Sequence, residues 1–308
     1  MNLLNIYTRL YSFFYINDSI NLMFAKLKKL TRKKANQQLP TFLNHFNYSS
    51  VKVLDDLIVS LTSFPARIDN VWMVIESIKN QSYLPQKIIL WLSKDQFPTE
   101  DTIPESLKCR IDNRFEIRMV DGDLKSHKKY FYVFQEFHDK IIITVDDDVF
   151  YHPDVIKHLY EDHKKFPLDV ITNIASRPLY NNNTIVPYKQ WKKVKEKYCT
   201  NNLVQIGIGG VLYPPDLNNP ILLNEKLILE LAPFADDLWL NAIMRLNGIS
   251  VRKSSFRYLP LGILSKTPTL SSYNRHNFGN DIQLEKLRDY FLKTVNRDLF
   301  ANSEYYEM

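Results

Sequence analysis

Four short apolar runs, each bounded by polar residues, divide the first half of the chain. Runs of this length between polar boundaries are typical of buried β-strands. Between the first two runs, apolar residues recur at helical spacing from Val71 to Ile78. Asp69, which precedes them, is placed to cap the first turn of this predicted helix. Strands that alternate with helices in this rhythm predict a largely parallel sheet with helices on its faces. The four predicted strands are 56–64, 86–93, 115–121 and 140–148.

The second half of the chain has a less regular pattern. The apolar run 203–215 is interrupted by glycines, which indicates a sharp turn or a close approach of the backbone to another group. A loop and then a helix are expected within 232–251, where Gly248 would end the helix in a left-handed conformation. The last predicted element is an amphipathic helix over 280–295.

Charge and cysteine content exclude two classes of protein. Residues 1–50 hold seven basic side chains and one acidic side chain, which accounts for the whole net charge of +6 and leaves 33 basic and 33 acidic residues in the remainder. Because this remainder is neutral, binding of nucleic acid by a basic face is not expected. Cys109 and Cys199 lack metal-ligand spacing and are interpreted as reduced thiols, so a disulfide scaffold is excluded as well.

The N-terminal arm, residues 1–35, places aromatic and aliphatic residues before a basic cluster. A secretory signal has the opposite order, and polar residues interrupt the apolar stretch before it could span a bilayer. The arm is therefore expected to lie on an anionic membrane surface. Docking on its own domain or on a partner subunit is the alternative. Residues 35–50 are interpreted as a linker, so that 1–50 form an arm with its linker, 51–300 one domain, and 301–308 a tail.

The run 140–148 ends on three adjacent carboxylates, Asp146, Asp147 and Asp148. In an extended strand, Asp146 and Asp148 would face the same side and Asp147 the opposite side. Two convergent carboxylates repel each other unless a cation lies between them. Oxygen ligands of this type suit Mg²⁺ or Mn²⁺, which bind through one or two carboxylates together with substrate phosphates. Solvent or a nearby basic cluster are the alternatives, because a solvated acidic turn needs no metal.

An Asp-x-Asp at the end of a strand in an α/β chain resembles the GT-A class of nucleotide-sugar-dependent glycosyltransferases. Other stretches between residues 55 and 290 are similar to bacterial members of that class, especially those that assemble polysaccharides and capsules. The resemblance implies a Rossmann-like GT-A fold, with a mostly parallel sheet flanked by helices, as the catalytic domain over 51–300. The stretches are VSLTSFPARI (59–68), SIKNQSYLPQKIILWLS (77–93), DLKSHKKYF (123–131), DDDVFYHPDVI (146–156), GIGGVLYPP (207–215) and ADDLWL (235–240).

The same resemblance implies which residues bind the donor and the metal. The first strand and its turn would hold the base and ribose, Asp121 or Asp123 would accept hydrogen bonds from the nucleotide, and lysines would bind the diphosphate as point charges. Taken by itself, Arg67 could serve either the diphosphate or the helix after it. The implied donor-binding residues are Thr62, Ser63, Pro65, Arg67, Asp121, Asp123, Lys125, Lys128, Lys129, Asp146, Asp147, Gly209 and Gly210, and the implied metal ligands are Asp146, Asp148 and His276.

The segment ADDLWL (235–240) lies where many inverting GT-A enzymes carry an acidic pair whose second member is the catalytic base. The resemblance therefore implies Asp237 as the base, with Asp236 as the alternative. Such a base removes the proton of the acceptor hydroxyl while the anomeric carbon of the sugar is attacked. At a helix start, the helix dipole is expected to keep the carboxylate ionised. A helix N-cap is the structural alternative, and in a retaining enzyme the residue would position a sugar instead.

These expectations describe a metal-dependent glycosyltransferase with Mn²⁺ or Mg²⁺ as cofactor. It would move a sugar from a nucleoside diphosphate, with UDP favoured, to a hydroxyl of a bacterial surface glycan or lipid-linked oligosaccharide, with inversion favoured. Its expected location is the cytoplasm, peripheral on the inner face of the cytoplasmic membrane. The alternatives are a non-catalytic glycan- or membrane-binding module on the same fold, and a nucleotidyltransferase, which would release pyrophosphate from a nucleoside triphosphate.

Overall fold

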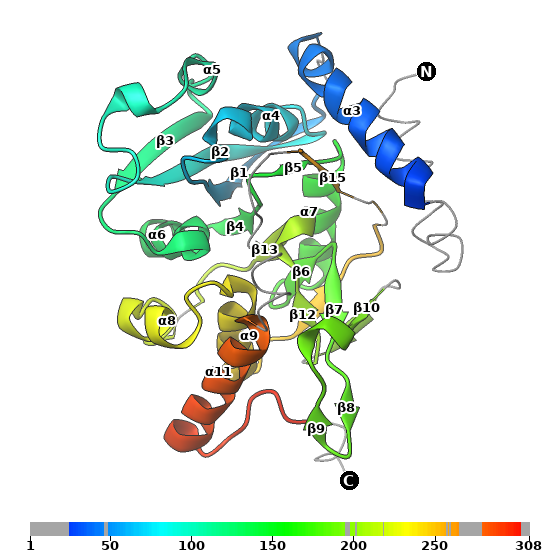
Figure 1. The fold of residues 1–308 in the computed structure, drawn as a ribbon, viewed down its shortest axis with the longest axis vertical. Coiled ribbons are helices and arrows are strands. Elements are labelled where there is room, and N and C mark those ends of the chain that lie inside the picture. Colours follow the sequence, from blue (N-terminus) through cyan, green and yellow to red (C-terminus); the bar gives the residue numbers. More distant parts are fainter. Residues whose placement is uncertain are drawn as a thin grey trace.

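The computed structural model describes residues 25–45, 49–194, 198–200, 202–217, 219–256, 258, 260–264 and 279–302. Its central element is an eight-stranded sheet, which helices cover on both faces (Figure 1). The predicted class, a Rossmann-like α/β fold with a mostly parallel sheet flanked by helices, is confirmed. Within the described ranges, no helix combines the length and the apolar character that crossing a bilayer requires.

The eight strands follow the spatial order β11-β14-β6-β13-β4-β1-β2-β3. Neighbouring strands are parallel from β4 through β1 and β2 to β3, and β14 is parallel to β6. By contrast, β13 lies antiparallel between β4 and β6, and β11 is antiparallel to β14. The strands are β1 (Lys52–Thr62), β2 (Tyr83–Ser93), β3 (Phe115–Val120), β4 (Ile141–Thr144), β6 (Val170–Thr172), β11 (Tyr198–Thr200), β13 (Val211–Tyr213) and β14 (Val251–Lys253).

Two helical layers enclose this sheet. One face is covered by α3, α4, α5 and α7, and the other by α6, α8, α9 and α11, because the buried apolar residues of these helices fall into two separate clusters. The helices are α3 (Ala25–His45), α4 (Ile68–Lys79), α5 (Glu105–Lys108), α6 (Lys128–Glu136), α7 (Val155–Lys165), α8 (Glu225–Leu231), α9 (Asp236–Leu246) and α11 (Gly279–Val295), with short 3₁₀ turns η1 (Glu100–Thr102), η2 (Lys125–His127), η3 (Tyr188–Gln190) and η4 (Gly207–Gly209).

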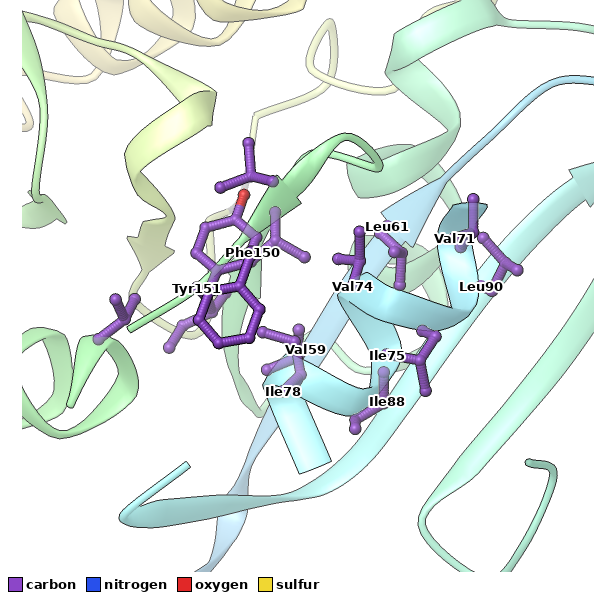
Figure 2. Packing of buried hydrophobic residues seen from close by; sticks show 14 of the residues in the cluster. Val59, Leu61, Val71, Val74, Ile75, Ile78, Ile88, Leu90, Phe150 and Tyr151 are labelled. Atoms are coloured by element: carbon purple, nitrogen blue, oxygen red, sulfur yellow. The ribbon is translucent and has the colours of Figure 1, made fainter. Parts of the chain in front are cut away.

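Strand β1 is apolar on both sides because both of its faces are covered. Val59 and Leu61 join the cluster under α4, whereas Ile58 belongs to the cluster on the opposite face. Figure 2 shows the first cluster, in which side chains of α4 lie over those of β1 and β2. Period-two alternation of polar and apolar residues is therefore absent from the apolar end of β1, as expected for a strand of a doubly covered sheet.

Smaller sheets lie beside the main one. The strand β5 follows the three aspartates directly and pairs with β15, and a short hairpin joins β8 to β9 through Asn182 and Asn183, both at positive φ. A three-stranded antiparallel sheet has the order β10-β7-β12. The bounds are β5 (Val149–Phe150), β7 (Ala175–Arg177), β8 (Tyr180–Asn181), β9 (Thr184–Ile185), β10 (Lys192–Lys193), β12 (Val204–Gln205) and β15 (Leu261–Gly262).

Three local predictions can be compared with this fold. The positive φ of Gly248, +70°, confirms the predicted end of α9. The cap predicted for α4 is wrong, because Arg67 occupies the N-cap position and Asp69 lies within the first turn. The linker predicted for 35–50 is also wrong in its first part, since α3 continues to His45 and includes Pro40.

Helix α3 is docked on the body of the protein. It lies against α4 and β15 (Figure 1) and buries Ala35, Leu39 and Leu43, which are spaced by four residues along one helix face. The docking alternative that the sequence left open for the arm therefore holds for this helix. Residues 1–24 of the arm lie outside the described residues.

The buried face of α3 gives a stability prediction. We expect Leu39→Ala to lower the free energy of unfolding by about 2–5 kcal/mol, because it removes a fully packed leucine and leaves a cavity. The control is Leu30→Ala on the exposed face of the same helix, where a change within about 0.5 kcal/mol is expected. Urea titration measures both values, and equal losses in the two variants would contradict the docked position of α3.

Candidate functional site

The candidate site lies at one edge of the main sheet. Parallel strands bring their carboxyl ends to the same edge, so the residues after β1 and β4 meet there. Because β13 runs antiparallel to β4, the glycines before β13 reach this edge from the opposite direction. Here the protein has a cavity of about 1050 Å³, lined by residues from both halves of the chain, among them Ser63, Asp146 and Asp237.

The three aspartates have basic and hydroxyl partners. Arg67 donates to Asp147 Oδ1 at 2.7 Å and its Nη1 lies 3.0 Å from Asp148 Oδ2. The Ser63 hydroxyl donates to Asp147 Oδ2 at 2.6 Å. The charge at the end of the strand is therefore compensated by nearby cations, which was one of the alternatives left open by the sequence.

The geometry of this turn differs from the expected strand alternation. Strand β4 ends at Thr144, so Asp146, Asp147 and Asp148 form a turn rather than the end of an extended strand. Asp147 is buried against Ser63 and Arg67, whereas the other two carboxylates are partly exposed in the cavity. Asp146 and Asp148 thus reach the same cavity because the chain turns there, and not because alternate residues of a strand face the same side.

The pKa of Asp148 is raised although Arg67 lies beside it. Burial and the neighbouring charge of Asp146 raise the pKa of Asp148 to about 6, although Arg67 and Arg32 oppose the shift. A carboxylate with a raised pKa gains free energy when a further cation comes close, because the cation favours its ionised form. A divalent cation beside Asp148 would therefore act to lower its pKa.

Lys129 joins the aspartates to the second acidic pair. Its Nζ lies 3.0 Å from Asp146 Oδ1 and 2.7 Å from Asp236 Oδ2, and the side chain is only 6% exposed. Burial acts to lower the pKa of Lys129, but the charges of Asp146 and Asp236 outweigh it and raise this pKa well above its ordinary value. One permanently charged ammonium therefore connects the strand end with the start of α9.

The two carboxyls at the start of α9 have opposite pKa shifts. Burial acts to raise the pKa of Asp236, but Lys129 outweighs it and the pKa is lowered. Burial and the charge of Asp236 raise the pKa of Asp237 to about 8, although Lys129 opposes the shift. The helix dipole was expected to keep Asp237 ionised, whereas burial and the acidic neighbours act in the opposite direction on its pKa. A pKa near neutrality suits a general base.

Gly207 lies at the centre of this cluster. Its N–H donates to Asp237 Oδ2 at 3.2 Å. A Cβ added to Gly207 would lie 3.0 Å from both Asp146 Oδ1 and Lys129 Nζ, and 3.5 Å from Asp237 Oδ1. The first two contacts are tight for a Cβ, so a larger residue at position 207 would make Asp146 and Lys129 shift slightly.

Asp123 forms ion pairs with two further lysines that line the cavity. The Lys125 Nζ lies 2.6 Å from Asp123 Oδ2, and the buried Lys128 binds the other oxygen of the same carboxylate. Gln96 also donates to Asp123, at 3.0 Å. Burial acts to raise the pKa of Asp123, but hydrogen bonds from the two lysines outweigh it and lower this pKa. Asp123 thus remains ionised and fixes both ammonium groups at the cavity.

The structure brings most of the predicted site residues into one cavity. Asp121 is not among the lining residues; its side chain is 88% exposed and pairs with Lys94 outside the cavity. Pro65, Gly209 and Gly210 do not line it either, and His276 lies outside the described residues. The predicted residues that line the cavity are Thr62, Ser63, Arg67, Asp123, Lys125, Lys128, Lys129, Asp146, Asp147, Asp148, Asp236 and Asp237.

Glycine is required at positions 209 and 210 for the local backbone structure. A Cβ at Gly209 would lie 2.9 Å from the backbone nitrogen of Ile174, and Gly210 has a φ of +78°. Both positions therefore require glycine for the turn into β13. Among these glycines, it is Gly207 that contacts the acidic groups.

Several cavity residues were not selected from the sequence. Arg32 comes from α3, and Gln96 and Ser126 come from a loop and a short turn, whereas Gly207 does not line the cavity and meets the site through its N–H bond to Asp237. Gly207 had a sequence signal, since it interrupts an apolar run that precedes the acidic pair. Arg32 had none, because its position in the site depends on contacts with residues about 230 positions later in the chain.

The residues present fit a divalent cation that is shared with a ligand. Among the described residues, no group of three or more His, Cys, Asp or Glu side chains is arranged to hold a metal by itself. Asp146 and Asp148 nevertheless both line the cavity, and each is partly exposed there. Mg²⁺ is usually bound in this way, through one or two carboxylates and the phosphates of a substrate.

Comparisons with known proteins add two solved structures of low similarity. The structure of CMP:2-keto-3-deoxy-manno-octonic acid synthetase complexed with CTP aligns with 76% of this chain and 99% of that chain, at 11% identity and a TM-score of 0.40. The inositol-1-phosphate CTP transferase from T. maritima aligns with 77% of this chain and 98% of that chain, at 12% identity and a TM-score of 0.40. Neither similarity identifies a reaction for this chain. No protein-family model and no curated protein matches the sequence.

Proposed function

We propose that the protein is a metal-dependent glycosyltransferase that transfers a sugar from a nucleoside diphosphate donor to a hydroxyl group. One observation carries this proposal. The cavity combines two partly exposed carboxylates and basic side chains with a carboxyl of raised pKa, Asp237, and Lys129 binds both Asp146 and Asp236. Glycosyl transfer needs groups of both kinds: cations that stabilise the departing diphosphate, and a base that takes the proton of the attacking hydroxyl.

The donor half of the cavity would bind the nucleotide. Asp146 and Asp148 would hold Mg²⁺ or Mn²⁺, which supplies positive charge to the departing diphosphate. Arg67 fixes Asp147 and Asp148 in place, and the buried Lys128, held by Asp123, adds positive charge to the same side. Base and ribose would lie along Thr62 and Ser63, at the end of β1. The identity of the base, with uracil favoured by the sequence resemblance, is part of this proposal.

The acceptor half would activate the hydroxyl. Asp237 would take the hydroxyl proton while the oxygen attacks the anomeric carbon and the bond between that carbon and the diphosphate breaks. The Gly207 N–H fixes one oxygen of Asp237, which leaves the other oxygen for the proton. Direct displacement of this kind inverts the anomeric centre. Asp236 is bound to Lys129 and keeps a lowered pKa, so it suits an electrostatic role better than that of the base.

The acceptor and the cellular location rest on the sequence resemblance. A bacterial surface glycan or a lipid-linked oligosaccharide is the proposed acceptor, and the inner face of the cytoplasmic membrane the proposed location. Helix α3 supports contact with an anionic surface, because Lys29, Lys33 and Lys34 are exposed while its opposite face is docked. Residues 1–35 would then attach the domain as a peripheral protein.

Nucleotidyl transfer is a second candidate, because the donor half alone would also serve it. Two carboxylates, Arg67 and two lysines could bind a nucleoside triphosphate with a metal ion as well as a diphosphate. Glycosyl transfer is favoured because Asp237, with its raised pKa, lines the same cavity and would supply a base, which nucleotidyl transfer to a phosphate does not need.

Product analysis distinguishes the candidates. The full chain is incubated with Mn²⁺ or Mg²⁺ and either a panel of nucleoside diphosphate sugars or a panel of nucleoside triphosphates with sugar phosphates. We expect release of a nucleoside diphosphate from one sugar nucleotide and no pyrophosphate from any triphosphate. Pyrophosphate release would establish nucleotidyl transfer instead, and a protein that binds these ligands without releasing either product would be a non-catalytic module.

A further inference from the structure

A side chain of the N-terminal helix reaches the edge of the candidate site. Arg32, on α3, lines the same cavity as Asp148 and Gly262, and its Nε donates to the carbonyl oxygen of Gly262 at 3.3 Å. The two residues are 230 positions apart in the sequence. The helix that precedes the predicted domain therefore contributes directly to the cavity.

The backbone opposite Arg32 is tied to the aspartates. Gly262 belongs to β15, which pairs with β5 immediately after Asp148, and the N–H of Ile263 donates to the Asp148 carbonyl oxygen at 2.7 Å. A Cβ at Gly262 would lie 2.5 Å from the Arg32 guanidinium. A side chain here would displace the guanidinium, so glycine at this position lets Arg32 lie directly against β15, the partner of the strand that follows Asp148.

A second residue of α3 fixes the helix at this place. The Asn36 amide donates to the Gly262 carbonyl oxygen at 3.1 Å, and its Oδ1 accepts the N–H of Leu264 at 2.7 Å. Asn36 thus binds the backbone on both sides of Ile263, at the end of β15 and at Leu264 after it. Together with the buried apolar face of α3, these bonds hold Arg32 at the cavity rather than in solvent.

Arg32 differs from the other cations of the donor half in its partners. Arg67, Lys125, Lys128 and Lys129 each bind at least one aspartate. In the part of the chain that the structure describes, Arg32 forms no ion pair, although its charge acts on Asp148, and its hydrogen bond to Gly262 uses Nε rather than the Nη groups. A guanidinium has five N–H donors, and its planar fork matches the oxygens of a phosphate group.

We propose that Arg32 binds the phosphate groups of the nucleotide donor, so that α3 is a part of the active site and not only an anchor. The proposal rests on the proposed function, because it takes a nucleoside diphosphate as the ligand. Arg32 would contact the diphosphate from the side of β15, while Lys128 lies on the side of Asp123. The base and ribose would make no contact with Arg32.

Calorimetric binding tests this role with the full-length protein in the presence of Mg²⁺. The probes are the diphosphates of uridine, guanosine, adenosine and cytidine, followed by the unphosphorylated nucleoside of the one that binds best. For Arg32→Gln we expect affinity for the diphosphate to fall by about 10- to 100-fold, the range of hydrogen bonds to charged groups, and affinity for the nucleoside to stay unchanged. Arg32→Lys keeps the charge without the fork and should lose less.

The matched control is Lys33→Gln, which removes an exposed charge from the neighbouring position of the same helix. It should bind both probes as the wild type does. Wild-type affinity of Arg32→Gln for the diphosphate would overturn the role of Arg32 alone and leave the proposed function standing. Equal loss of nucleoside and diphosphate binding would show a structural role of Arg32 instead. A wild-type protein that binds no nucleoside diphosphate would refute the proposed function and this inference together.

Discussion

Replacement of Asp148 by asparagine is expected to lower the rate of sugar transfer at least about 100-fold, since a metal ligand contributes several kcal/mol to the transition state. The substitution keeps the size of the side chain and removes the charge that Asp148 brings to the cavity. Arg67 would retain Asp147, to which it is bound at 2.7 Å, so the turn itself should remain folded. The release of nucleoside diphosphate over a range of Mn²⁺ concentrations measures the effect.

The matched control for this substitution is Asp139→Asn. Asp139 is exposed in the turn before β4, outside the cavity, and its charge is replaced in the same way. We expect wild-type rates for this variant. If Asp148→Asn kept both the rate and the dependence on Mn²⁺, Asp148 would not be a metal ligand.

Asp237→Asn is expected to lower transfer to the acceptor by about 10²- to 10⁴-fold, the usual contribution of a general base. Affinity for the nucleoside diphosphate should change little, because Asp237 would contact the acceptor and not the donor in the proposed reaction. A lower transfer rate with unchanged nucleotide affinity would identify a base. A residue that binds the donor would instead lose nucleotide affinity when it is replaced. Initial rates with saturating donor, together with calorimetric binding of the nucleoside diphosphate, measure the two quantities.

The pH dependence gives a second readout for Asp237. Burial and Asp236 raise the pKa of Asp237 to about 8, and a base acts only in its ionised form. The transfer rate of the wild type should therefore rise with pH through this pKa and fall as pH drops below it. In Asp237→Asn this rise should be absent from the residual activity. A wild-type profile that stays flat across this pH range would show that another group is the base.

Much of the fold could be predicted because its information is local. The strands β1, β2, β3 and β4 correspond to four apolar runs, since strands covered on both faces have continuous apolar sequences. Helix α3 was missed in part because the polar residues and the proline of 35–50 resemble a linker. Its buried positions, Ala35, Leu39 and Leu43, do follow a helical period, but three residues give a weak signal.

The site was predictable in its composition and less so in its contacts. The two acidic segments could be recognised from sequence, and the structure brings both into one cavity. Their partners could not be recognised, because the Arg67–Asp147 and Lys129–Asp236 ion pairs join segments far apart in the chain. The raised pKa of Asp237 was likewise hidden, since it depends on burial and on the exact approach of Asp236 and Asp146. The charged groups can be identified from local sequence, whereas the ion pairs that compensate their charges depend on tertiary contacts.

The contact between α3 and β15 also affects how the protein is made. Arg32 of α3 leaves the ribosome 230 residues before its hydrogen-bonding partner Gly262. At about 5–20 residues per second, the delay is roughly 10 to 50 s. During translation the apolar face of α3 can pack against α4 well before Arg32 and Asn36 meet their partners. The nascent chain therefore completes this edge of the cavity only after β15 has been synthesised.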